Sequence, residues 1–161
     1  MPSTSPPPGT PDMAILLTAA YRSLVDRLQE ELSAAGLSEM RSAYGFVIRA
    51  LAAEELTATE LAERLDVSKQ AASIKLAEME ALNLIERRRD PDDGRRQLLR
   101  LAPRGRRVSE RAMATSVELE RELVRRHGRK AVDACREVLS GMVERQGDGG
   151  NLAARRSRAV W

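Results

Sequence analysis

The chain has 161 residues, long enough for one domain with a substantial core, and 32% of them are charged, 42% hydrophobic and 2% aromatic. So few aromatic rings argue against a single-strand binder that stacks bases, and one cysteine excludes an intramolecular disulfide. We expect a cytoplasmic protein without a membrane partner, because the sequence lacks a signal-peptide core and any apolar run near 20 residues.

The net charge of +3 is unevenly distributed along the chain. Residues 21–66 hold five basic and nine acidic side chains, whereas residues 84–107 hold nine arginines and four acids. A positive field on one short stretch is what a phosphate-facing surface requires. Charge runs also occur simply as hydrated faces, so the concentration by itself leaves both interpretations open.

The first segments read as an arm followed by two helices. Residues 1–11 contain five of the seven prolines and predict a disordered arm, after which residues 12–146 are expected to form the folded domain. Apolar spacing predicts an amphipathic helix over about 13–34 and a second helix over about 38–53. Their apolar positions are Tyr21, Leu24, Leu28 and Leu32 in the first helix, and Phe46, Val47, Ala50 and Leu51 in the second.

Two further helices follow within a few residues of each other. In "TATELAERL" (57–65), Thr57 and Glu60 have the spacing of a capping box. In the next helix, 66–82, Ser68 is the expected N-cap and Ala72, Leu76 and Met79 form the buried stripe. Such a pair is typical of a helix-turn-helix, although spacing alone fits an ordinary helical hairpin as well.

The next segment predicts a β-hairpin. Asn83 suits the left-handed backbone that ends a helix. "LIERRR" (84–89) and "RQLLRLA" (96–102) then alternate as two short strands, with Pro91 and Gly94 between them. The stretch "RRRDPDDGRRQ" (87–97) is therefore interpreted as a wing carrying arginines on its strands and tip, rather than as a solvated loop.

Residues 61–105 resemble the winged helix-turn-helix of the MarR family of bacterial transcription regulators. The family pattern includes Leu-Ala, Val-Ser, a Leu/Met-Glu pair, Gly-Leu-Ile/Val, Asp-Pro-x-Asp, Arg-Arg and Leu-Thr-x-x-Gly. In this chain it falls on Leu61-Ala62, Val67-Ser68, Met79-Glu80, Leu84-Ile85, Asp90-Pro91, Asp93, Arg95-Arg96, Leu101 and Gly105. The resemblance implies a mainly α fold with a small β-hairpin wing and terminal dimerisation helices, and a DNA-binding part over about 38–102.

Four positions depart from the family pattern. Asn83 stands where glycine is usual, and Gly94 lengthens the wing tip. Ala102 replaces the usual threonine and removes a helix N-cap, a loss of about 1 kcal/mol. Ile74 occupies a recognition-helix position that is often polar; it either meets a thymine methyl group or leans into the core.

Double-stranded DNA is the expected partner, and nine residues are expected to contact it. Lys and Gln side chains at the start of helix 68–82 can hydrogen-bond base edges, while Ser and the helix N-terminus suit phosphate. The wing is expected to lie along the backbone, with Arg95 in the minor groove, Asp93 orienting it, and Arg88 and Arg96 on phosphates, as is Lys75. The DNA-binding set is Ser68, Lys69, Gln70, Ser73, Lys75, Arg88, Asp93, Arg95 and Arg96.

Two long amphipathic helices are predicted over 103–127 and 129–146, and the tail 147–161 is predicted to be mobile and basic. Their apolar stripes exceed what a winged helix alone can cover, which predicts a homodimer. The stripes comprise Val108, Ala112, Thr115, Leu119 and Leu123, then Val132, Cys135, Leu139 and Met142.

No chemistry-bearing constellation is recognised, so we expect a non-enzyme without cofactor or metal. The lone His127 lies at a helix end, where a solvated side chain is the ordinary role, and Cys135 is expected to be a small core residue. The resemblance implies a small-molecule effector. Tyr21, Tyr44 and Met113 are candidate walls for its pocket, but such spacing is more often core.

The sequence therefore predicts a homodimeric, sequence-specific transcriptional regulator, an effector-responsive repressor that binds a pseudo-palindromic operator. Two alternatives stay open: a thiol-based redox sensor acting through Cys135, and a winged-helix module that binds a protein partner.

Overall fold

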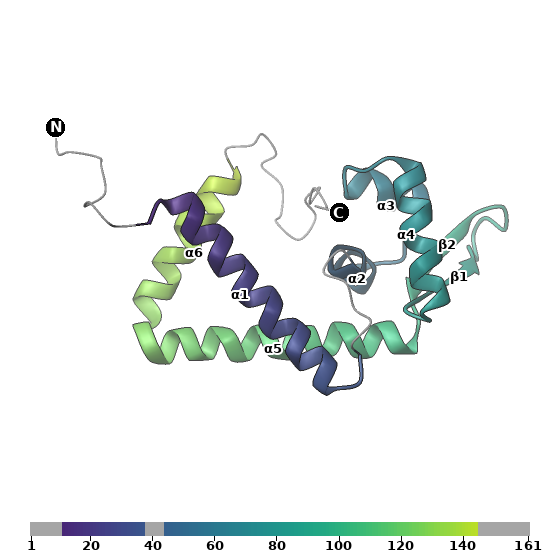
Figure 1. Ribbon diagram of the computed structural model, residues 1–161. Coiled ribbons are helices and arrows are strands. Elements are labelled where there is room, and N and C mark those ends of the chain that lie inside the picture. The colour runs from purple at the N-terminus through teal and green to yellow at the C-terminus, as the bar shows by residue number, and fades with distance from the viewer. Residues whose placement is uncertain (1–10, 38–43, 145–161) are drawn as a thin grey trace. The chain divides into compact units, whose positions relative to one another are not determined.

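A computed structural model describes residues 11–37 and 44–144 of the chain. The described residues form six helices and one two-stranded sheet (Figure 1). The chain divides into two units, residues 1–40 and residues 41–161, and each unit is described by itself. Residues 1–10 of the predicted arm 1–11 and the whole predicted tail 147–161 lie outside the described residues.

The first unit contributes helix α1, Met13–Ala34, which confirms the helix predicted over 13–34. Asp12 caps its start by accepting a 2.6 Å hydrogen bond from the Ala14 N–H. Gly36, just after the C-cap Ala35, adopts a left-handed backbone with φ +73°. Large apolar side chains of α1 lie exposed, among them Met13, Ile15, Leu16, Tyr21 and Leu24.

In the second unit, α2 (Tyr44–Ala53), α3 (Ala58–Arg64) and α4 (Lys69–Ala81) supply most of the core. The predicted stripe of α4 is confirmed, since Ala72, Leu76 and Met79 are all buried. The predicted face of α2 is partly wrong: Phe46 is only half-buried, whereas Ile48 is buried. The predicted start of this helix at residue 38 lies outside the described residues.

Side-chain caps and two left-handed residues shape the helix-turn-helix. The capping box is confirmed, because Thr57 N–H donates to Glu60 at 2.7 Å and Glu60 N–H donates to the Thr57 hydroxyl at 3.2 Å. Ser68 caps α4 by accepting from Ala71 N–H at 3.1 Å. Asp66 and Asn83 have φ of 52° and 55°, so the left-handed turn predicted at Asn83 is confirmed and the one at Asp66 is an addition.

Strands β1 (Ile85–Arg89) and β2 (Gln97–Leu101) pair antiparallel and form the predicted wing. Ile85 lies opposite Leu101 at the root, where both are buried. Leu56, between α2 and α3, exchanges two backbone hydrogen bonds with Leu99 at 3.3 and 2.7 Å. The root of the wing is therefore anchored to the helices, and the predicted winged helix-turn-helix fold is confirmed.

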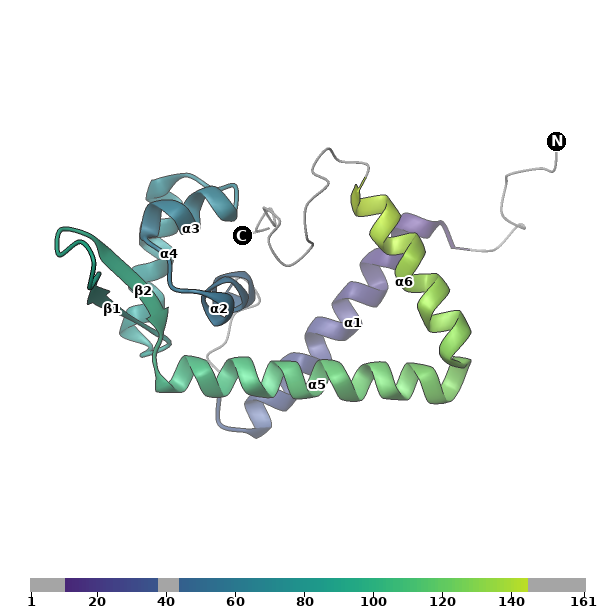
Figure 2. The same ribbon diagram turned by 180° about the vertical axis from the view of Figure 1, so that it is seen from behind.

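Helices α5 (Pro103–His127) and α6 (Arg129–Glu144) meet at a bend at Gly128, with α4 and the wing at the start of α5 (Figure 2). As predicted, the N-cap Ala102 of α5 makes no side-chain hydrogen bond. Glu120 on α5 joins the two helices through Arg136 at 2.9 Å and Arg129 at 3.3 Å. These guanidinium groups, Arg136 foremost, hold the pKa of Glu120 below its usual range.

The prediction that Cys135 is a core residue is wrong, because its side chain is exposed. The apolar stripe of α6 on which it lies is also open: Leu139 and Met142 are exposed, and Val132 is half-buried. Periodicity correctly identified an apolar stripe, but none of the residues in 11–37 and 44–144 buries it.

Candidate nucleic-acid interface

The outer face of α4 presents the four residues that were expected to lead into DNA. Ser68, Lys69, Gln70 and Ser73 are all exposed, at the N-cap and in the first turns of the helix. Lys69 and Gln70 occupy the first turn, where backbone N–H groups lack helical partners and favour anions. The cap at Ser68 occupies the N–H of Ala71 and fixes where that turn begins.

Lys75 lies apart from this face. Its Nζ is 3.0 Å from Glu78 Oε2 and 5.7 Å from the centre of the Tyr44 ring, and its side chain is only 17% exposed. The Tyr44 hydroxyl donates to the same Glu78 oxygen at 3.1 Å. Lys75 is therefore tied into a cluster between α2 and α4 in the free protein.

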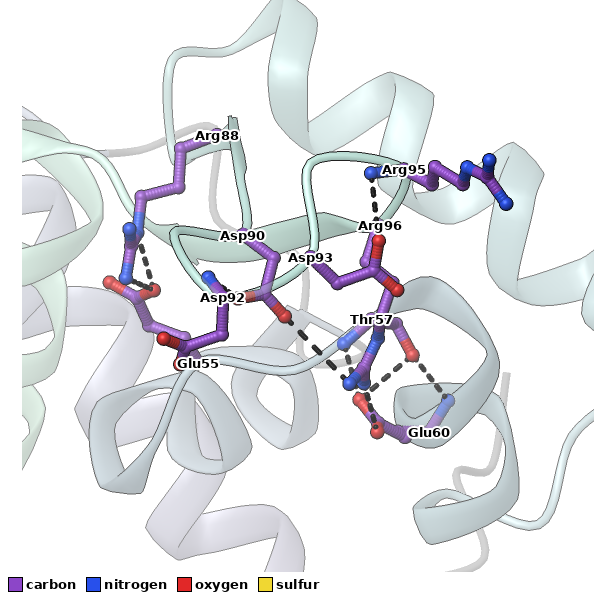
Figure 3. A network of polar contacts seen from close by, with 9 residues as sticks. All are labelled: Glu55, Thr57, Glu60, Arg88, Asp90, Asp92, Asp93, Arg95 and Arg96. Carbon is purple, nitrogen blue, oxygen red and sulfur yellow. Dashed lines mark hydrogen bonds and ion pairs between the residues drawn. The ribbon is translucent and has the colours of Figure 1, made fainter.

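Two arginines of the wing pair with glutamates near α3 (Figure 3): Glu55 lies just before this helix, and Glu60 lies in its first turn. Arg88 on β1 pairs with Glu55 at 2.6 Å. Arg96, just before β2, pairs with Glu60 at 2.8 Å and lies 3.7 Å from Asp90. The side chains of Arg88, Glu55, Arg96 and Glu60 are each about one-third to one-half exposed, and only that of Asp90 is mostly buried. DNA phosphate can therefore compete with these carboxylates for the arginines.

Glu60 links the capping box to the wing. Its Oε2 accepts from the Thr57 N–H and hydroxyl, while its Oε1 accepts from Arg96. These hydrogen bonds, those from Thr57 first and that from Arg96 next, lower the pKa of Glu60. The carboxylate is thus ionised at neutral pH and holds Arg96 beside the start of α3.

At the wing tip, Asp93 orders the backbone rather than the arginine side chain. Its carboxylate accepts from the Arg95 N–H at 3.0 Å, and its carbonyl accepts from the Arg96 N–H at 2.9 Å. The Arg95 guanidinium makes no hydrogen bond or ion pair with any described residue and extends away from the rest of the network (Figure 3). The tip therefore presents an ordered backbone and the guanidinium of Arg95, which no described residue engages.

Sequence reasoning missed two features of this surface and left a third undecided. Arg89, at the end of β1, is exposed and is unpaired within the described part of the chain. Glu55 and Glu60 were not recognised as arginine partners, because 33 and 36 residues separate them from Arg88 and Arg96. Ile74 is 57% exposed, which excludes its leaning into the core.

A cavity of about 420 Å³ lies where the end of α2, strand β2 and the start of α5 meet. Tyr21, Tyr44 and Met113 do not line it. Tyr44 is a core residue, whereas Tyr21 and Met113 are exposed. Charged groups dominate the lining, which includes Glu54, Glu55, Arg100, Arg106 and Glu110.

Neither a metal cluster nor a membrane span is found in the ranges 11–37 and 44–144. No three His, Cys, Asp or Glu side chains gather there as metal ligands would. None of the helices in these ranges combines the length and apolar character needed to cross a bilayer.

Comparisons with known proteins agree with this geometry. Residues 40–96 match the family model described as the MarR family, which confirms the predicted resemblance. No curated protein matches the chain in sequence.

Solved structures match the fold over most of the chain. Rv1404 from Mycobacterium tuberculosis has a TM-score of 0.67 at 18% identity, covering 89% of this chain and 100% of its own. The reduced form of MarR from E. coli gives 0.64 at 22% identity, covering 83% and 98%. A variant of MepR from S. aureus, solved bound to an oligodeoxyribonucleotide, gives 0.57 at 20% identity, covering 84% and 99%.

Proposed function

Because the chain carries a winged helix-turn-helix of the MarR family, we propose that it is a homodimeric transcriptional regulator that binds an operator in double-stranded DNA. This proposal rests on one observation: α4 has an exposed polar face, and beside it the same domain has a wing that carries arginines and is anchored at its root. We further propose that it acts as a repressor. It is a binding protein, not an enzyme.

Helix α4 enters the major groove in this proposal. The exposed Lys69 and Gln70 lie on its first turn, and their side chains are long enough to reach base edges. Ser68 and Ser73 lie beside them and suit phosphate or base contacts. A structural hairpin would not need this face to be free of internal partners.

The wing lies along the adjacent backbone. Arg95 has an unengaged guanidinium at the tip and is the residue suited to the minor groove. Asp93 supports it by holding the tip backbone. Arg88 and Arg96 reach phosphates by exchanging the carboxylates of Glu55 and Glu60 for phosphate oxygens, and the exposed Arg89 joins them. Lys75 is a peripheral phosphate contact at most, since Glu78 retains it.

Dimerisation rests on apolar side chains that the single chain leaves open. These side chains are exposed on α1, α5 and α6, and monomeric soluble proteins rarely expose large contiguous apolar patches. The exposed set is Met13, Ile15, Leu16, Tyr21 and Leu24 on α1, Met113, Val117 and Leu123 on α5, and Val138, Leu139 and Met142 on α6. Sedimentation should give twice the 17.8 kDa chain mass at micromolar concentration. A stable monomer would contradict the dimer.

The cavity at the α2–β2–α5 junction is the proposed effector site. Its volume of about 420 Å³ falls in the range of small-molecule pockets. Glu55 lines the cavity and also forms an ion pair with Arg88 of the wing at 2.6 Å. A cationic ligand that pairs with Glu55 therefore breaks the ion pair with Arg88. An effector that competes in this way changes operator affinity in the wild type and has no such effect in Glu55→Gln, where the ion pair with Arg88 is already lost.

Selection of duplexes from a random-sequence pool tests the function directly. A two-fold operator should emerge, with half-sites about one or two helical turns apart, roughly 34–36 Å per turn. Recovery of unrelated sequences, together with tight binding to an acidic protein, would favour the protein-interaction alternative instead.

A further inference from the structure

An isoleucine lies in the middle of the polar face of α4. Ile74 is two residues from both Ala72 and Leu76, and at about 100° per residue it therefore points away from the side where these two are buried. Its side chain is 57% exposed, and its neighbours on the same face, Gln70 and Ala77, are exposed as well. The position cannot serve the core of this domain.

The side chains next to Ile74 on this face are small, which leaves room for an apolar group to approach it closely. Ala77, one turn onward, adds no bulk, and Ser73 adds only a short side chain. Isoleucine in a helix is held almost entirely in one χ1 rotamer, so ordering it on contact costs little entropy. Lys69 and Gln70 on the preceding turn supply the polar contacts that fix the helix in a groove.

On the basis of the proposed function, we infer that Ile74 determines operator specificity by packing on the 5-methyl group of a thymine in the major groove. The thymine methyl is the one apolar group that a base pair displays there. Residues four apart on a helix are about 6 Å apart along its axis. Since base pairs repeat every ~3.4 Å, the thymine lies within about two base pairs of the one read by Gln70.

Replacing operator thymines one at a time with deoxyuridine tests the inference, because this removes only the methyl group. For the wild-type dimer, one position in each half-site should lower affinity about fourfold per replaced thymine, the amount expected for one buried methyl group. Ile74→Ala should bind the thymine and deoxyuridine operators at that position equally well. Ile74→Val should keep part of the preference.

Gln70→Ala is the matched control on the same face. It should retain the thymine preference at the Ile74 position while losing preference at a neighbouring pair. Melting curves should be nearly unchanged for Ile74→Ala, because the side chain is largely exposed.

The inference is overturned if wild type binds every deoxyuridine operator as well as the thymine operator, or if Ile74→Ala discriminates as wild type does. An operator without thymine near the pair read by Gln70 overturns it too. In each of these cases selective DNA binding persists, and the proposed function stands. Absence of selective binding to any duplex would instead remove the proposed function itself.

Discussion

Replacing Gly105 with alanine should destabilise the protein by about 2–3 kcal/mol. A Cβ at this position would overlap the backbone carbonyl oxygen of Leu84, lie 3.0 Å from its carbonyl carbon and lie 3.4 Å from a methyl carbon of Leu101. A backbone group cannot rotate away as a flexible side chain can. Either α5 or the chain entering β1 must therefore move.

The magnitude follows from three contributions. Overpacking costs about 1–3 kcal/mol, and contact with backbone places Gly105→Ala at the upper end. The same movement weakens the 3.0 Å hydrogen bond from Ala102 N–H to Leu84 O, a loss of about 1 kcal/mol. The better helix propensity of alanine returns up to about 1 kcal/mol.

Thermal unfolding at a fixed protein concentration provides the assay, with a decrease of roughly 5–10 °C expected for Gly105→Ala. Gly45→Ala is the matched control, since Gly45 lies in α2 with nothing within 4 Å of an added Cβ. It should be neutral or slightly stabilising. Equal melting temperatures for the two variants would refute the proposed close contact between α5 and Leu84.

Four further variants probe the interface and its supports. Arg95→Ala should leave stability within about 0.5 kcal/mol of wild type but flatten the salt dependence of DNA binding by about one unit per protomer; an unchanged slope would mean that Arg95 contacts no phosphate. Gln70→Ala should weaken the best operator by about 1–3 kcal/mol and relax selection at one base pair per half-site, whereas an identical selected motif would exclude base reading by Gln70. Glu60→Gln should cost up to about 1 kcal/mol at neutral pH. Because the folded-state pKa of Glu60 is lowered, the difference in unfolding free energy between wild type and Glu60→Gln is fully present above the ordinary glutamate pKa of about 4.3, and it disappears as pH falls through the lowered value. Urea titrations of both proteins over this pH range measure the difference, and a difference that does not change with pH would contradict the role of Glu60. Peroxide should leave operator affinity unchanged in both wild type and Cys135→Ser, and a loss confined to wild type would support the thiol-sensor alternative.

The local features of the fold were predictable because their causes lie within a few residues. The box of Thr57 and Glu60, the cap at Ser68 and the turn at Asn83 each depend on contacts within one turn of helix. The strands were also predictable, since Pro91 and Gly94 separate two alternating runs. Within the described residues, these short-range rules place both strands and the helix ends within a few residues, whereas the predicted start of the second helix at residue 38 lies outside them.

The distant pairings of the wing were not predictable. Arg88 and Arg96 looked free because their carboxylate partners, Glu55 and Glu60, lie more than 30 residues away in sequence. Periodicity also cannot tell an apolar stripe that is buried in its own chain from one that is open, which is why Cys135 was misassigned. For the same reason the sequence could not decide whether Ile74 on α4 is buried or exposed, and only the three-dimensional structure shows that it is exposed.

The central claim, that α4 and the wing together recognise a DNA sequence, is tested most directly by competition binding at one salt concentration. The selected operator should be bound at least about 10³-fold more tightly than a scrambled duplex of the same length and composition. Equal affinity for the two duplexes would show that the arginine-bearing wing only attracts phosphate, and would contradict the claim.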